Sequence, residues 1–197
     1  MPISESEYYL LKKEMRDSRI DGTIIDIETT GDFQKSPDPG DMQDYLVRYE
    51  KIKITAVGTL NKNSIMVFVA KGRQSLSRFQ EKAIRIMSSA GHPLYAFNKS
   101  FEEGCYYWNS GKRMLNIEHD IQKFQFEKKE NVVVELGLHQ HNDPFHGDGS
   151  LCKRAFELGK LHDVIAHNRA CLLKEYYIFR KRGAREFKTT WLDQGKL

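Results

Sequence analysis

Apolar side chains recur along the chain with two different periods, and these periods predict its elements. Short apolar runs bounded by turn-forming residues are typical of buried strands. Such runs predict five strands, at residues 23–28, 52–60, 65–70, 93–97 and 114–124. The polar residues 61–63 indicate a tight turn, so the second and third strands are expected to form an antiparallel hairpin.

Helical spacing of apolar residues predicts the remaining elements. Phe79, Ala83, Ile84 and Met87 follow one another at helical intervals, and Gly91 comes after them as a helix stop. Three further helical segments are predicted: residues 5–17, a short helix starting at FEEGCYYWNS, and most of residues 132–179 apart from the loop HQHNDPFHGDGS.

This order of elements predicts the fold class. Three strands followed by strands linked through helices indicate an α/β domain with a mixed five-stranded sheet flanked by helices. At 197 residues the chain is most simply a single domain, residues 1–197. We expect a helix near its start, at about 5–17, and a basic tail at about 180–197.

Composition narrows the class of protein. The chain is 40% hydrophobic and 29% charged, and no apolar run approaches the length that spans a bilayer, so we expect no membrane partner. The three cysteines have no paired spacing, which fits reduced thiols and a cytoplasmic location. The net charge of +4 permits a polyanionic partner without requiring one.

The stretch DIETTG, residues 26–31, is the strongest chemical signal in the sequence. Asp26 and Glu28 are two residues apart at the end of a predicted strand, so both side chains point to the same face of the sheet. Two such carboxylates repel each other unless they bind a cation or share a proton. The alternative interpretation is a polar strand end that faces water.

Three motifs together resemble the DEDD superfamily of 3′–5′ exonucleases, which has an RNase H-like fold. DIETTG is similar to the first motif, and FNKSFEEG to the second, where Asn98 and Phe101 match the usual Asn and aromatic residue and Glu102 stands in place of the usual Asp. The stretch HDVIAHNRACLLKE is similar to the branch whose third motif reads Tyr or His, Asn, two residues and Asp. His167 begins that motif, but Cys171 stands where the Asp belongs.

The resemblance implies metal-dependent hydrolysis of single-stranded DNA or RNA from the 3′ end. Two Mg²⁺ or Mn²⁺ ions about 4 Å apart stabilise the attacking and leaving oxygens in such a site. By this resemblance Asp26 bridges both ions, Glu28 holds one, and Glu102 contributes directly or through water. His167 is the expected base, because an unperturbed imidazole has a pKa near neutrality.

The third motif leaves alternatives open, because cysteine is a soft ligand that suits Mg²⁺ poorly. Asp163 lies two helical turns before Cys171 and one before His167, and is the candidate that would replace the missing oxygen ligand. Asp163 equally fits a residue that favours the helix dipole. His167 is alternatively a half-buried residue packed on the sheet, and Cys171 a small buried apolar residue.

The expected contacts with nucleic acid come from aromatic and basic residues. Asn98 and Phe101 are the candidates for binding a terminal base, and Arg180, Lys181 and Arg182 for following the phosphate backbone, although a charged run is more often a solvated end. A separate loop offers His139, His141, His146 and Cys152, but their spacing matches no zinc pattern, so a polar surface loop is the preferred interpretation.

Two functions therefore remain open from the sequence. One is the 3′–5′ exonuclease. The alternative is a catalytically impaired, nuclease-like module that binds nucleic acid within a repair or processing complex, and Cys171 is the residue that favours it. Fold resemblance alone does not decide between an active and an inactive site.

Overall fold

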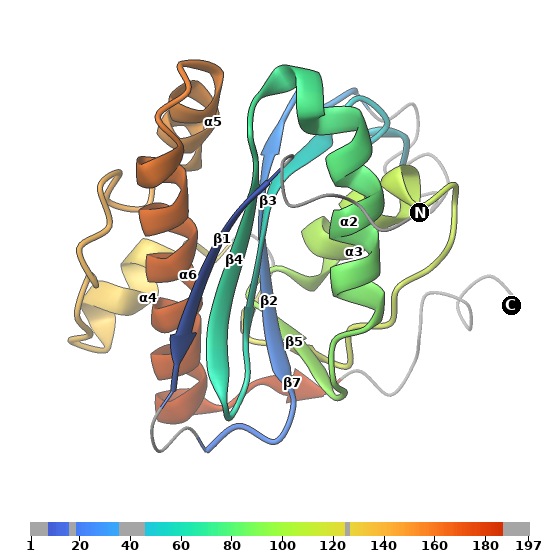
Figure 1. Cartoon of the computed structure of the whole chain (residues 1–197). Coiled ribbons are helices and arrows are strands. Elements are labelled where there is room, and N and C mark those ends of the chain that lie inside the picture. Colours follow the sequence, from blue (N-terminus) through green and yellow to red (C-terminus); the bar gives the residue numbers. More distant parts are fainter. Residues whose placement is uncertain (1–7, 16–18, 36–45, 125–126, 187–197) are drawn as a thin grey trace, which may run out of the picture.

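The computed structural model describes residues 8–15, 19–35, 46–124 and 127–186. Within them one seven-stranded sheet has the strand order β1-β4-β3-β2-β5-β6-β7 (Figure 1). Its strands are β1 (Tyr8–Glu14), β2 (Thr23–Thr30), β3 (Lys53–Leu60), β4 (Ser64–Ala70), β5 (Leu94–Ala96), β6 (His119–Asp120) and β7 (Arg185–Glu186). The helices are η2 (Arg73–Ser75), α2 (Leu76–Ser88), α3 (Lys99–Asn109), α4 (Lys129–Glu135), α5 (Gly149–Glu157) and α6 (Leu161–Arg182).

The sheet is mixed, as predicted. β1, β4, β3 and β2 pair antiparallel in that order, β2, β5 and β6 pair parallel, and β7 returns antiparallel to β6. The predicted α/β class with a mixed sheet flanked by helices is confirmed, and the arrangement is compatible with an RNase H-like fold. The sheet has seven strands where five were predicted.

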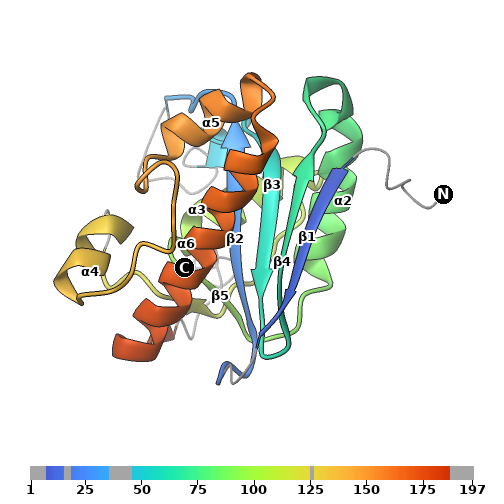
Figure 2. The same ribbon diagram turned by 60° about the vertical axis from the view of Figure 1, so that its left-hand side comes forward.

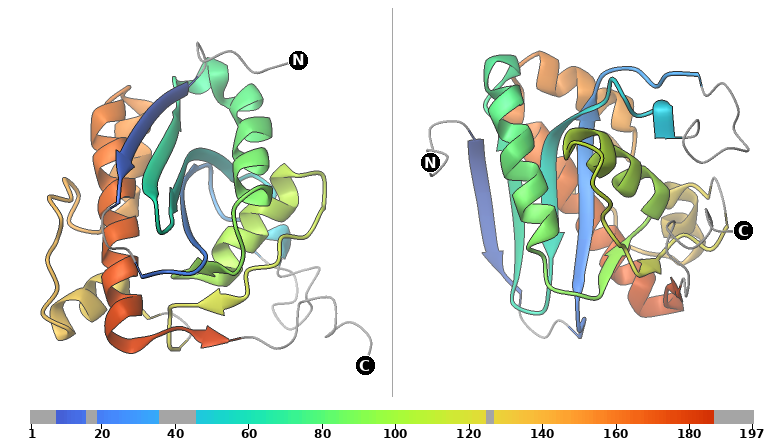
Figure 3. Two further views of the ribbon diagram at one scale, coloured as in Figure 1. Left: turned by 60° about the horizontal axis from the view of Figure 1, so that its bottom comes forward. Right: turned by 90° about the vertical axis from the view of Figure 1, so that its right-hand side faces the viewer.

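Helices cover both faces of the sheet. Helices α2 and α3 pack on one face, and α5 and α6 pack on the other, with α4 against α6 (Figures 1 and 2). The two views in Figure 3 show the same division, with α2 in green and α6 in red on opposite sides. Strands β2 and β3 are therefore buried on both faces, which explains their nearly continuous apolar runs.

The predicted N-terminal helix is wrong where the structure describes it. Residues 8–14 form β1, which pairs antiparallel with the whole of β4, and the ring of Tyr8 lies 5.7 Å from that of Phe68. A short isolated helix is only marginally stable, so an unpaired sheet edge outweighs the helical preference of this segment. The other predicted residues of this helix, 5–7 and 16–17, lie outside the described part of the chain.

Two other boundaries also differ from the prediction. Leu115, Ile117 and Ile121 are buried as the pattern predicts, yet only His119–Asp120 forms a strand in the predicted segment 114–124. The start of the predicted tail completes α6 and then forms β7 after a turn at Gly183, whose φ is 73°. Residues 187–197 lie outside the described part of the chain.

Among the described residues, no helix is both long and apolar enough to cross a membrane.

Candidate active site

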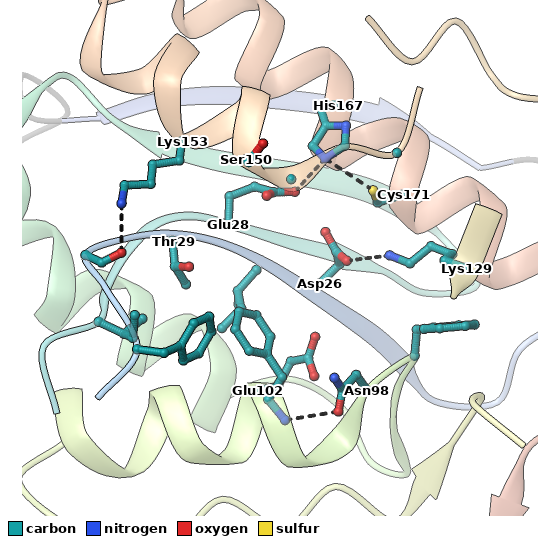
Figure 4. A pocket seen from close by; sticks show the side chains of 18 of the residues that line it. Asp26, Glu28, Thr29, Asn98, Glu102, Lys129, Ser150, Lys153, His167 and Cys171 are labelled. Atoms are coloured by element: carbon teal, nitrogen blue, oxygen red, sulfur yellow. Dashed lines mark hydrogen bonds and ion pairs between the residues drawn. The ribbon is translucent and has the colours of Figure 1, made fainter. Parts of the chain in front are cut away.

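A pocket of ≈ 470 Å³ lies at the end of β2, between α3 on one side and α5 and α6 on the other (Figure 4). Asp26 and Glu28 project into it from the same face of β2, as their spacing predicts. The register with β3 shifts directly after Glu28, where Thr55 is the extra residue of a bulge, and pairing resumes between Thr29 and Ile54. Both carboxylates are buried, with 5% and 8% of their residue surface exposed.

Asp26 is held by two nitrogen donors from the helical side of the pocket. The Asn168 side-chain amide donates to its carboxylate at 2.7 Å, and the Lys129 ammonium donates to the other oxygen at 2.9 Å. Gly58 is the register partner of Asp26 on β3. A Cβ atom at Gly58 would lie 2.1 Å from the Asn168 side-chain oxygen, so only glycine lets α6 approach Asp26 this closely.

Lys129 is a cation inside the carboxylate cluster that the sequence analysis did not identify. Its ammonium contacts both Asp26 and Glu175, and Glu175 is completely buried in α6. Burial lowers the pKa of Lys129, but the nearby acidic groups, Asp26 first and Glu175 among the others, together outweigh burial and raise the pKa well above its usual range. Burial raises the pKa of Glu175 well above the usual range of a carboxyl group.

Glu102 reaches the same cluster from α3. The Asn98 side chain accepts a hydrogen bond from the Phe101 backbone N–H at 3.3 Å and so caps this helix. The Glu102 side chain is buried, and its Oε2 atom has no hydrogen-bond partner among the described residues. Burial, and then the charge of Glu175, raise the pKa of Glu102 well above its usual range.

Glu28 faces His167 instead of Lys129. The His167 Nε2 atom lies 3.6 Å from the Glu28 carboxylate, and its Nδ1 atom donates to Asp143 at 2.7 Å. Burial raises the pKa of Glu28 to about 7. Burial lowers the pKa of His167, but the charge of Glu28 and the bond to Asp143 raise it to about 11. In this state the His167 ring is protonated at neutral pH and donates hydrogen bonds, whereas a general base has to accept a proton.

Two buried thiols complete this side of the pocket. Cys171 has its sulfur within 4.8 Å of oxygen atoms of Asp26 and Glu28, so the third-motif position does face the two carboxylates. Cys152, in α5, forms a second such group with Glu28 and His167. Burial raises the pKa of both thiols, that of Cys171 to about 11.

The mouth of the pocket combines aromatic rings with an amine. Phe33 is 51% exposed and lies against Phe101, with 6.2 Å between the ring centroids. On the opposite wall, the Lys153 ammonium donates to Asp32 at 2.8 Å, and Ser150 lies in the first turn of α5. The mouth therefore offers flat apolar surface on one side and a positive charge on the other, while the Ser150 and Leu151 N–H groups of α5 already donate to Asp148.

The structure brings Asp26, Glu28, Asn98, Phe101, Glu102 and His167 together around one pocket. Four predicted residues do not line it: Asp163, Arg180, Lys181 and Arg182. Asp163 lies in the first turn of α6, and the three basic residues lie in its last turn. Arg180 is thirteen residues from His167, which is about 20 Å along the helix axis.

Sequence reasoning missed Lys129, Asp143, Lys153 and Glu175 as site residues. Glu175 carries a usable signal, since it follows His167 and Cys171 at intervals of four on one helix face. Lys129 and Asp143 stand in a helix start and a loop without a chemical motif, so only folding places them beside Asp26 and His167.

Comparison of the chain with models of known protein families, with curated protein sequences and with solved structures gives no match. The fold and the pocket by themselves define the class: an α/β protein with a mixed sheet whose second strand ends in a buried carboxylate cluster.

Proposed function

We propose that the protein is a metal-dependent 3′–5′ exonuclease that acts on single-stranded DNA or RNA ends. The observation that carries this proposal is the convergence of Asp26, Glu28 and Glu102 at one pocket. They come from β2 and α3, and all three are buried although nothing in their local sequence requires it. Buried acids of this kind are characteristic of sites where charge is used in chemistry.

The residues present partly fit Mg²⁺ or Mn²⁺. Asp26, Glu28 and Glu102 supply hard oxygen ligands, and the free Oε2 atoms of Glu102 and Glu175 are acceptors without a partner among the described residues. Divalent cations at these carboxylates would supply the positive charge that stabilises the attacking and leaving oxygens of a phosphodiester. The Lys129 ammonium, which now neutralises Asp26, has to give way to such a cation.

The mouth of the pocket suits the end of a single strand. Phe33 and Phe101 offer ring faces for stacking on a terminal base, and Asn98 offers an exposed amide beside them. The Lys153 ammonium on α5 faces them and would contact a phosphate. A base held on one wall and a phosphate on the other would place the adjacent phosphodiester over the carboxylates.

The cytoplasm is the location that we propose for this activity. Cys105, Cys152 and Cys171 are free and buried, as expected of thiols in a reducing compartment.

A second candidate is a nuclease-like module that binds strand ends without cutting them. Two observations favour it. Lys129 fills the space between Asp26 and Glu175 with a tethered positive charge, and Cys171 puts sulfur where a hard oxygen ligand would serve Mg²⁺. Such a protein would keep the pocket mouth and recognise a strand end within a repair or processing complex.

End-labelled single-stranded DNA and RNA, incubated with Mg²⁺ or Mn²⁺, distinguish the two candidates. We expect the wild-type protein to shorten 5′-labelled strands from the 3′ end. Asp26→Asn should slow this by at least about 100-fold, because charge stabilisation by metal ions contributes several kcal/mol to such reactions. Asp163→Asn is the matched control, since it changes the same group in an acid outside the pocket, and it should cut at the wild-type rate.

Cutting by Asp26→Asn at the wild-type rate would exclude this pocket as the active site. If the wild-type protein binds strand ends but does not cut them, the variant Lys129→Met tests whether the Lys129 ammonium prevents cleavage. Cleavage that appears only in Lys129→Met identifies the ammonium as the group that blocks cation binding. Binding without cleavage in both proteins establishes the binding module.

A further inference from the structure

A second group of possible ligands lies on the side of the pocket away from Lys129. Glu28 on β2, Cys152 on α5 and His167 on α6 each place a ligand atom within 4.8 Å of the other two. Cys152 and His167 are 1% and 2% exposed, so three separate elements bury an oxygen, a sulfur and a nitrogen at one point. The following inference goes beyond strand cleavage and does not rest on it.

A hydrogen bond at Nδ1, the ring nitrogen that points away from Glu28, fixes the orientation of the His167 ring. Its Nδ1 atom donates to the Asp143 carboxylate, and Asp143 is held in turn by the buried Lys174 ammonium at 2.6 Å. Backbone N–H groups of Phe145 and Gly147 also donate to Asp143, each at 2.9 Å. Only Nε2 is then directed at Glu28 and the thiols. A carboxylate behind the far nitrogen is the arrangement that accompanies histidine ligands in metal sites.

The spacing of the ligand atoms suits a tetrahedral cation. Zn²⁺ binds nitrogen and oxygen at about 2.0–2.2 Å and sulfur at about 2.3 Å, so tetrahedral ligand atoms lie roughly 3.3–3.8 Å apart. The distance from His167 Nε2 to Glu28 Oε1 is 3.6 Å. The Cys152 sulfur lies within 4.8 Å of both atoms. The nitrogen and the oxygen thus already have a tetrahedral spacing, and the sulfur is near enough to complete it by a movement of its side chain.

The donor set selects the kind of metal. A thiol, an imidazole and one carboxylate are the mixed ligands that suit Zn²⁺, whereas Mg²⁺ requires oxygen ligands. We propose that Glu28, Cys152 and His167 bind one Zn²⁺ ion, with the fourth coordination position open to the pocket. Three protein ligands with one open position distinguish a zinc site that meets a substrate from a purely structural one.

The ligand forms of this group balance the charge of the ion. Zn²⁺ binds thiolate and neutral imidazole, so the Cys152 thiol proton and any proton on His167 Nε2 leave to solvent when it binds. Thiolate, carboxylate, neutral imidazole and the dication then sum to zero, so the ion is accommodated without an unpaired buried charge.

Cobalt is the probe for this site, because Co²⁺ in zinc sites gives a thiolate charge-transfer band that oxygen ligands do not give. We expect the metal-stripped full chain to bind one Co²⁺ with this band, and Zn²⁺ but not excess Mg²⁺ to remove it. Cys152→Ser should lose the band and bind Zn²⁺ at least about 10-fold more weakly, since even outer-shell changes cost that much. Cys105→Ser, which alters a buried thiol outside the group, should keep both properties.

Circular dichroism of each metal-free variant tests whether it is folded. If Cys152→Ser is unfolded, X-ray absorption of the wild-type protein loaded with Zn²⁺ replaces it, and sulfur in the first coordination shell is the result expected. The proposal is overturned if wild-type protein shows no thiolate band, if folded Cys152→Ser binds Zn²⁺ as tightly as wild type, or if the zinc shell contains no sulfur. None of these measurements requires nucleic acid, so they stand apart from the cleavage test.

Discussion

Burial determines which side chains of the pocket carry charge. Lys129 and His167 are the two cations that face the carboxylates at its base, and each contacts one member of the Asp26–Glu28 pair. Glu102 has no cation of its own, and burial favours its protonated form. Burial thus raises the pKa of Glu28, Glu102 and Glu175 alike, and the cations beside Glu28 and Glu175 offset only part of this shift.

The raised pKa of Glu28 predicts how the stability of the protein depends on pH. Its pKa is raised from 4.5 to about 7, so its contribution to stability is fully present below pH 4.5 and is lost as the pH rises to about 7. The free energy of unfolding of the metal-free protein should therefore fall relative to Glu28→Gln across this window. The difference should not exceed about 3 kcal/mol. Denaturant titrations at several pH values in the presence of a chelator measure it.

His167 keeps its hydrogen bond to Asp143 in both proteins, but Glu28→Gln also removes the charge that contributes most to the raised pKa of His167, so the difference reports the Glu28–His167 pair. Parallel pH profiles for wild type and Glu28→Gln would show that Glu28 titrates like an exposed glutamate.

The single helix α6 contributes several of the buried side chains opposite α3. His167, Cys171 and Glu175 follow one another at intervals of four, and Asn168 lies beside them against β3. The other wall, α3, needs only its capped first turn to position Glu102. The pocket therefore depends on how closely α6 packs on the sheet.

Gly58 sets that distance. Gly58→Ala should push the Asn168 side chain away from Asp26, because the added Cβ would meet its oxygen at 2.1 Å. We expect a loss of about 1–3 kcal/mol of unfolding free energy, which is typical of an overpacked contact. Chemical denaturation measures it, with Gly149→Ala as the control, since a Cβ atom there has nothing within 4 Å. Equal stability of both variants would contradict the close packing of α6.

Basic residues are distributed over the molecule in a way that the sequence does not reveal. Arg182 is expected from sequence to bind phosphate, yet its guanidinium donates to Glu127 at 2.8 Å and is largely buried. Lys153, which sequence analysis passed over, lies at the pocket mouth. The positive charge available to a strand end is thus at the mouth and not in the last turn of α6.

Binding of a labelled single strand tests this distribution. Lys153→Gln should weaken binding and reduce the dependence of log affinity on log salt by about one unit, as expected for one lost phosphate contact. Arg182→Met should leave binding unchanged but lower the unfolding free energy by about 3 kcal/mol, because Glu127 loses its buried partner. Fluorescence anisotropy in a chelator keeps the strand uncut. If Arg182→Met weakens binding and Lys153→Gln does not, the sequence-based prediction that Arg182 contacts the phosphate backbone would hold instead.

Local patterns were sufficient for much of the fold. The apolar runs of β2, β3 and β4 identify strands because their side chains are buried on both faces. The apolar residues of α2 identify a helix because they recur at helical spacing. The pairing of Asp26 with Glu28 on one face follows from the period of a strand alone. These features depend on neighbours within a few residues, which the sequence contains.

The remaining features depend on partners far away in the chain. Residues 8–14 form a strand because β4 offers an unpaired edge, and Lys129 enters the cluster because α4 packs against α6. Cys152 and His167 are brought to Glu28 by packing of α5 and α6, although their sequence spacing matches no metal motif. Burial then sets the charge of these groups, and burial is a property of the assembled layers that no local pattern encodes.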